Sequence, residues 1–120
     1  MDLALDRVRR VLHRMRLRLP CKVITFAGTN GKGSTVRFVE SIYVSAGYRV
    51  GAYTSPHLVA YGERIQLNQC LAGDDELVAA FSAVDQARQG IPLTHSEFGT
   101  LAALYIFSSN KLDVILLEVG

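Results

Sequence analysis

The residues of this 120-residue chain best suited to chemistry lie in a glycine-rich segment, Gly28-Thr-Asn-Gly-Lys-Gly-Ser-Thr35. Glycines let backbone N–H groups converge on a phosphate, a helix N-terminus adds positive potential, and a lysine reaches the outer phosphates. Lys32 is the expected phosphate lysine, and Ser34 or Thr35 offers a hydroxyl to phosphate or Mg²⁺. The strict GxxxxGK[ST] spacing is not met, and a glycine-rich turn with a surface lysine is the alternative. The expected strand before the segment and helix after it favour a phosphate-binding loop.

Two further polar residues lie at the ends of expected strands. Ser55 comes after the strand at 49–53, and Glu118 comes directly after the apolar run at 114–117. Ligands of open α/β sheets bind beyond the carboxyl ends of the strands, so Ser55 is expected beside the glycine-rich segment. Its tripeptide, Ser-Pro-His, is also a common turn. Glu118 ends the apolar run 114–117, and an acid there can hold Mg²⁺ directly or through water. The alternative for Glu118 is a carboxylate that simply emerges from the sheet; the nearby loop favours the metal role.

The elements that position these residues alternate between strand and helix. Short β-branched or apolar runs predict strands at 22–27, 49–53 and 114–117, the first of them buried on both faces. Periodic apolar residues predict helices at 3–18, 34–46, 74–89 and 97–109. A weak alternation at 63–68 predicts a small extra strand or a loop edge. The pattern indicates an α/β fold with a parallel sheet flanked by helices. Three aromatic residues at helical spacing are expected in the core: Phe38, Tyr43 and Tyr105.

Composition excludes several other classes of protein. With 49% hydrophobic and 20% charged residues, the chain is ordinary globular material of one domain at most. No apolar run approaches the ~18 to 20 residues of a membrane span, and the N-terminus lacks the pattern of a secretory signal. Cys21 and Cys70 lie far apart and form neither a disulfide framework nor a zinc ribbon. A reducing cytosol is the simplest compartment.

The basic residues concentrate at the N-terminus, where residues 1–22 hold seven basic and two acidic side chains. Helical spacing predicts an amphipathic helix whose arginines face solvent. Its apolar stripe comprises Leu5, Val8, Val11, Leu12 and Met15. Contact with nucleic acid or anionic lipid is the alternative for this basic face. Binding to a phosphate backbone would fall steeply as salt rises, which separates the two interpretations.

Four blocks of the sequence together resemble the bifunctional dihydrofolate synthase/folylpolyglutamate synthase family of the Mur ligase superfamily. They are VITFAGTNGKGST (23–35), AGYRVGAYTSPHLVAYGERI (46–65), LTHSEFGTLAALYIF (93–107) and LDVILLEVG (112–120). The resemblance covers nearly the entire chain. It implies that residues 1–120 are a partial ATP-binding domain, the incomplete N-terminal part of a Mur-ligase-like central ATPase domain, with an amphipathic helix at 1–19. The family's C-terminal glutamate-binding domain would lie after residue 120.

The resemblance also implies a reaction, its cofactors and its site residues. The implied enzyme is an ATP- and Mg²⁺-dependent ligase that joins L-glutamate to dihydropteroate, and to tetrahydrofolate, through an acyl phosphate. The ATP phosphates would be bound by Thr29, Asn30, Gly31, Lys32, Gly33 and Ser34, with Lys32 as the main catalytic charge. Ser55 and Glu118 match the family's Mg²⁺ ligands. The dihydropteroate contacts would be Thr94, His95, Ser96 and Glu97, and the loop 55–63 resembles the family's mobile substrate loop.

The resemblance further implies a cytoplasmic monomer whose partners are small molecules, with neither nucleic acid nor membrane among them. Residues 1–120 alone are expected to be inactive as a ligase. Two alternatives stay open: a Mur-type ligase that adds an amino acid to a cell-wall precursor, and a non-catalytic nucleotide-binding or nucleic-acid-binding module. The blocks SPHLVAYGERI and LTHSEFGTLAAL favour the folate branch.

Overall fold

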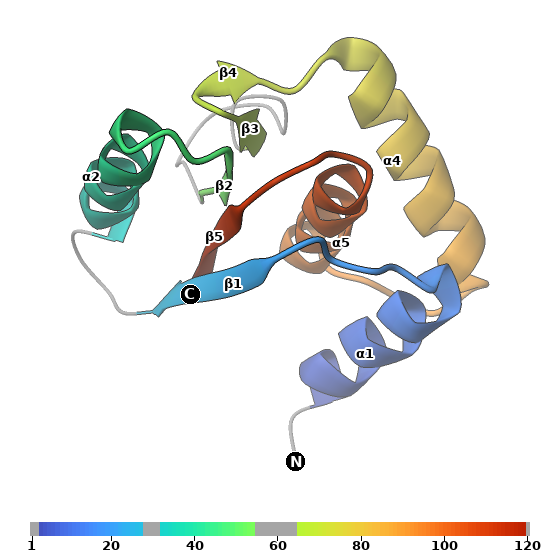
Figure 1. Ribbon diagram of the computed structural model, residues 1–120. Helices are drawn as coiled ribbons and strands as arrows, with labels where there is room; N and C mark the ends of the chain where they lie inside the picture. The colour runs from blue at the N-terminus through green and yellow to red at the C-terminus, as the bar shows by residue number, and fades with distance from the viewer. Residues whose placement is uncertain (1–2, 28–31, 55–64, 120) are drawn as a thin grey trace.

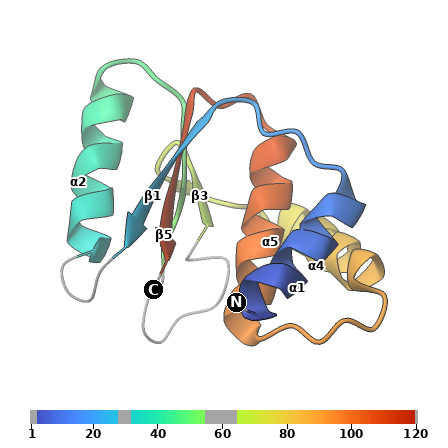
Figure 2. The ribbon, with the colours of Figure 1, turned by 90° about the horizontal axis from the view of Figure 1, so that it is seen from below.

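The computed structural model describes residues 3–27, 32–54 and 65–119, which form one sheet covered by helices on both faces. The strands, in the spatial order β1-β5-β2-β3-β4, are β1 (Lys22–Ala27), β5 (Val114–Val119), β2 (Val50–Tyr53), β3 (Ile65–Leu67) and β4 (Cys70–Leu71). The helices are α1 (Leu3–Met15), α2 (Lys32–Ser45), α4 (Asp74–Arg88) and α5 (His95–Ser108). Helix α2 covers one face of the sheet, while α5, backed by α1 and α4, covers the other (Figures 1 and 2).

The sheet is mixed, although the sequence predicts a parallel one. Strand β5 lies between β1 and β2 and is parallel to both, which confirms the prediction for the three main strands. Strand β3 pairs antiparallel with β2, and β4 pairs antiparallel with β3. The β3–β4 connection consists of Asn68 and Gln69, both with positive φ, as a tight two-residue hairpin requires. Within the predicted stretch 63–68, the described residues Ile65–Leu67 form a strand, whereas β4 is too short to leave a pattern.

The prediction that β1 is buried on both faces is wrong. Thr25 is exposed, and Val23 and Ile24 are only half-buried. The reason is position, because β1 forms an edge of the described sheet and has a single neighbour, β5. In the middle strand β5, by contrast, Ile115 and Leu116 are completely buried. Both strands are rich in apolar residues, so composition alone does not distinguish an edge strand from a central one.

Two apolar cores lie on the two faces of the sheet, and β5 contributes to both. Val114 and Leu116 pack on the α2 side, while Ile115 and Leu117 pack on the α5 side, as the two-residue period of a strand requires. The expected stripe of α1 is confirmed where its side chains are described: Val11 is completely buried, and Val8, Leu12 and Met15 pack around it. The helix ends at Met15, earlier than expected, because Arg16 adopts a left-handed conformation with φ of 52°.

Helix α2 buries one narrow stripe, and this overturns one expected core residue. Val36 and Val39 pack against the sheet together with Tyr43, which is confirmed as a core aromatic, as is Tyr105 on the opposite face. Phe38 is 67% exposed because it lies off that stripe, and Ile42, one turn further along, is 52% exposed. The periodicity of α2 therefore shows that the helix is amphipathic but does not by itself identify which aromatic faces the sheet.

The ends of the helices follow local sequence signals. Helix α2 ends as predicted before Gly47, whose φ of +94° suits a left-handed C-terminal residue. Helix α5 begins at His95, two residues earlier than predicted, because Thr94 caps it. Within the described ranges, no helix combines the length and apolar character needed to cross a membrane.

Candidate nucleotide and metal site

The register of the parallel strands brings three chain segments to one edge of the sheet. Phe26 of β1 pairs with Glu118 of β5, and Tyr53 of β2 pairs with Leu117. Glu118 therefore lies between the carboxyl end of β1, which leads to residues 28–31, and that of β2, which leads to residue 55. Helix α5 precedes β5 and runs antiparallel to it, so the N-terminus of α5 lies toward the same edge (Figure 2). This is the edge at which open α/β sheets bind ligands.

Glu118 is a buried carboxylate, exposed to only 7%. The ion pairs among the described residues are Arg7–Glu97, Arg37–Glu40 and Arg88–Asp85, so none of them places a cation on Glu118. Taking a carboxylate out of water is costly unless a cation or hydrogen-bond donors compensate for the lost hydration. A hard divalent cation prefers carboxylate oxygen, so the chemistry of Glu118 fits a Mg²⁺ ligand.

Much of the expected phosphate site lies outside the described residues. This holds for Thr29, Asn30 and Gly31, and also for Ser55. The backbone of Lys32, Gly33 and Ser34 is described, and these residues form the first turn of the 14-residue helix α2. That turn contains no acidic residue, so no carboxylate there offsets the positive end of the helix dipole. The backbone thus offers an anion-binding helix N-terminus at the start of α2.

Beneath this edge lies a polar network that the sequence analysis missed. The Arg37 guanidinium donates hydrogen bonds to Glu40 Oε1 at 2.9 Å, to Gln66 Oε1 at 2.7 Å and to Thr54 Oγ1 at 3.2 Å. It thereby connects α2 with the end of β2 and with β3. The only local sequence signal is the i, i+3 spacing of Arg37 and Glu40, which is common on solvated helix faces.

The expected dihydropteroate segment 94–97 forms the start of α5. Thr94 Oγ1 accepts a hydrogen bond from Glu97 N at 3.1 Å, and Glu97 Oε1 accepts one from Thr94 N at 2.8 Å, which is a capping box. Glu97 Oε2 also lies 3.2 Å from Nη2 of Arg7 in α1. Thr94 and Glu97 therefore stabilise the helix start, whereas His95 and Ser96 are exposed in the first turn.

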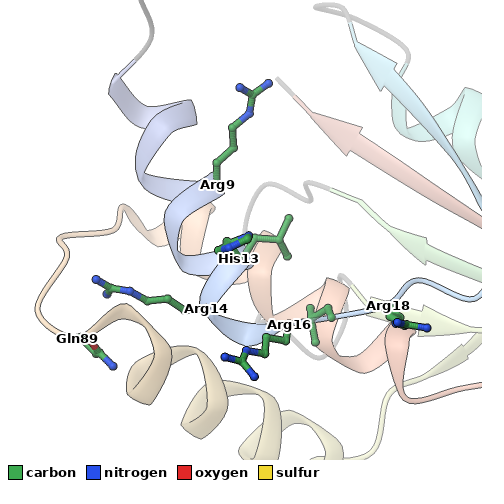
Figure 3. A pocket seen from close by; sticks show the side chains of 8 residues that line it. Arg9, His13, Arg14, Arg16, Arg18 and Gln89 are labelled. Carbon is green, nitrogen blue, oxygen red and sulfur yellow. The ribbon is translucent and has the colours of Figure 1, made fainter.

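A basic pocket of about 860 Å³ lies beside α1, between that helix, the segment that leads toward β1 and the C-terminal end of α4 (Figure 3). Its lining comprises Arg9, Leu12, His13, Arg14, Arg16, Leu17, Arg18 and Gln89. Arg14 has a structural role, because its Nη1 donates to the carbonyl oxygens of Ala87 at 3.3 Å and Arg88 at 2.9 Å at the end of α4. The pocket is separate from the edge that carries Glu118.

Comparison with known proteins gives close relatives over the whole chain, although no protein-family model matches it. The Escherichia coli K12 protein "Dihydrofolate synthase/folylpolyglutamate synthase" is 48% identical over 120 residues, covering 99% of this chain and 28% of its own length. The Haemophilus influenzae protein of the same name is 45% identical, with 99% and 27% covered. The chain thus spans little more than a quarter of the length of these relatives.

Solved structures agree with these relatives. E. coli FolC in complex with ADP superposes with a TM-score of 0.91 at 47% identity, over 100% of this chain and 29% of FolC. The Yersinia pestis bifunctional folylpolyglutamate synthase/dihydrofolate synthase complexed with AMPPNP and Mn ion gives 0.91 at 45% identity, over 100% and 30%. The mixed sheet with its flanking helices is therefore the N-terminal part of a Mur-ligase-like fold. By sequence and structure, the chain belongs to the bifunctional dihydrofolate synthase/folylpolyglutamate synthase family, as the four sequence blocks predict.

Proposed function

We propose that this chain supplies the nucleotide- and metal-binding part of an ATP-dependent ligase that joins L-glutamate to dihydropteroate and to tetrahydrofolate. The observation that carries the proposal is the position of Glu118, a buried carboxylate between the two strand ends that lead to the glycine-rich segment and to Ser55. The ADP, AMPPNP and Mn ion in the related structures support ATP and a divalent cation as cofactors.

In the proposed reaction, a carboxylate oxygen of the pterin substrate attacks the γ-phosphorus of ATP, and the bond to ADP breaks. The amine of L-glutamate then attacks the acyl carbon, phosphate leaves, and the amine loses a proton. Backbone N–H groups at the start of α2 and the Lys32 ammonium bind the phosphates, together with Thr29, Asn30, Gly31, Gly33 and Ser34. Ser55 and Glu118 hold Mg²⁺, which when bound offsets the phosphate charge.

For the pterin substrate, we propose the segment Thr94–Glu97 at the start of α5. Thr94 and Glu97 hold this helix start through the capping box, which fixes the backbone from which His95 and Ser96 extend. Because α5 begins toward the same edge as Glu118, a pterin bound there can direct its carboxylate at the phosphates (Figure 2).

We assign the catalytic activity to a longer protein, because the chain covers about 28% of the E. coli relative. In this proposal, residues 1–120 are a partial ATP-binding domain that is inactive without a glutamate-binding domain. The longer protein works in the cytoplasm as a monomer on small molecules and binds neither nucleic acid nor membrane.

Release of ADP by the longer protein tests the proposal, with ATP, Mg²⁺ and L-glutamate supplied and dihydropteroate compared with tetrahydrofolate. We expect release that requires glutamate together with either pterin. Release with dihydropteroate alone would restrict the activity to dihydrofolate synthesis. No release with either pterin would contradict the folate assignment and favour a cell-wall ligase.

A further inference from the structure

The Arg37 network contains an ion pair that the proposed reaction does not explain, between the half-exposed Arg37 guanidinium and the nearly inaccessible Glu40 carboxylate. Glu40 is 1% exposed, and its Oε1 accepts the 2.9 Å hydrogen bond from Arg37. Its other oxygen, Oε2, is buried and has no hydrogen-bond partner. An ion pair between a buried carboxylate and a guanidinium that is 37% exposed contributes little net stability, because desolvation of the carboxylate and solvent screening of the guanidinium offset the Coulombic gain. Stabilisation of the fold therefore explains this ion pair poorly, and its place beside the proposed site explains it better.

The network joins the two sides of the proposed site. Arg37 lies in the second turn of α2, five residues after Lys32. Its Nη2 donates to Thr54 Oγ1 at 3.2 Å, and Thr54 is buried at the end of β2, directly before Ser55. Thr54 lies one residue past the Tyr53–Leu117 pair, as Glu118 does on the neighbouring strand. One guanidinium thus connects the helix that carries the phosphate lysine with the strand end that precedes the metal ligand.

The remaining contacts restrict where this guanidinium can lie. Glu40, on the same helix, holds it from one direction. Gln66 of β3 accepts a hydrogen bond from Nη1 at 2.7 Å. Because β3 pairs with β2, this second contact also holds the guanidinium beside β2. A planar guanidinium bonded to three separate acceptors has little rotational freedom.

We propose that Arg37 and Glu40 are positioning residues, which set the distance between the start of α2 and the Ser55 end of β2 through the Thr54 hydroxyl. The inference rests on the proposed function, because Ser55 and Lys32 matter only if a metal–nucleotide complex binds between them. Neither residue touches the nucleotide in this account. They act by holding Thr54 at the end of β2, directly before the proposed metal ligand.

Three variants of the longer protein test the inference: Thr54→Val, which is nearly isosteric and lacks the hydroxyl, Thr54→Ser, which keeps it, and Arg37→Met. The matched control is Asp85→Asn, which removes the 3.0 Å i, i+3 ion pair with Arg88 on helix α4. The measurements are Mn²⁺ affinity in the presence of AMPPNP, the KM for ATP, the KM for L-glutamate and the midpoint of urea unfolding.

We expect Thr54→Val and Arg37→Met to weaken Mn²⁺ binding by about 10-fold and to raise the KM for ATP, as loss of a group that orients a metal ligand does. The KM for L-glutamate should not change, and Thr54→Ser and Asp85→Asn should bind Mn²⁺ like the wild type. Wild-type Mn²⁺ affinity in Thr54→Val would overturn the inference, whatever happens to the unfolding midpoint. Failure of the proposed function is a separate result, because it would appear as absent glutamate-dependent ADP release in the wild-type protein.

Discussion

Phe26 of β1 and Glu118 of β5 are register partners in the parallel sheet, one residue before β1 ends. A carboxylate of 7% exposure therefore lies level with the point where the chain leaves β1 for the glycine-rich segment. Since β5 is the middle of three parallel strands, the same carboxylate also adjoins the end of β2. This placement depends on strand order, and it is what unites three separate sequence motifs into one candidate site.

Substitution of Gly51 by alanine is expected to destabilise the sheet. A Cβ at this position in β2 would lie 2.8 Å from Leu112 Cδ1 and 2.8 Å from Phe107 Cδ1, both in the larger core. Overpacking of this kind typically costs about 1–3 kcal/mol. Urea unfolding of Gly51→Ala, compared with the wild type, measures the loss. Equal stability of Gly51→Ala and the wild type would show that the core around Phe107 accommodates the added methyl group without cost.

The capping box of α5 predicts a stability effect at a position that we also propose for substrate binding. Thr94→Ala removes the acceptor for Glu97 N and should lower the free energy of unfolding by about 1 kcal/mol. Thr94→Ser retains the hydroxyl and should restore most of that loss. Urea titration of the three proteins provides the comparison. If alanine and serine variants unfold alike, the Thr94 hydroxyl does not hold the helix start.

The two cysteines should differ in reactivity toward iodoacetamide. Burial raises the pKa of the half-buried Cys21 thiol, and the charge of Asp113 raises it further. Less thiolate forms at a given pH, so Cys21 should be alkylated more slowly than the exposed Cys70 in mildly alkaline buffer. Asp113→Asn removes the neighbouring charge and should accelerate the reaction of Cys21. Mass spectrometry of the time course gives both rates, and faster alkylation of Cys21 than of Cys70 would contradict its burial.

The raised pKa of Cys21 also determines how this thiol contributes to the free energy of unfolding as pH rises. The folded protein holds the Cys21 proton more tightly than the unfolded chain does, since the pKa is higher in the folded state. Below the pKa of the unfolded chain both states are protonated, and the contribution is complete. As pH rises past that value the unfolded chain ionises first, so stability falls until the folded thiol has ionised as well. In a Cys21→Ser variant, the free energy of unfolding, measured by urea titration at several pH values, should lack this decrease at alkaline pH.

Much of the fold can be predicted from periodicity and turn signals. The three parallel strands follow apolar runs, α4 opens on three acidic residues, and α2 ends before Gly47. The β3–β4 hairpin and the edge position of β1 cannot be predicted in this way, because both depend on which strands become neighbours. Phe38 illustrates the same limit within a helix. It belongs to the helical apolar pattern, yet α2 contacts the sheet through a narrower stripe than the pattern suggests.

The candidate site divides in the same way. Glu118 can be inferred from a single strand, because an acid at the end of an apolar run lies at the edge of the sheet wherever that strand is placed. The Arg37 network cannot be inferred so, since it joins residues 37, 54 and 66 through tertiary contacts. The segment 94–97 lies between these cases: its Thr-x-x-Glu spacing is a capping signal that predicts an earlier start for α5.

The most direct test of the central claim is the affinity of the longer protein for Mn²⁺ in the presence of AMPPNP, compared between wild type, Glu118→Gln and the control Asp85→Asn. Glutamine keeps the shape of the side chain and removes its charge. Loss of a charged contact costs about 1.5–3 kcal/mol, so we expect at least a tenfold weaker affinity in Glu118→Gln and none of this loss in the control. Equal affinity of Glu118→Gln and the wild type would contradict the assignment of Glu118 to the metal.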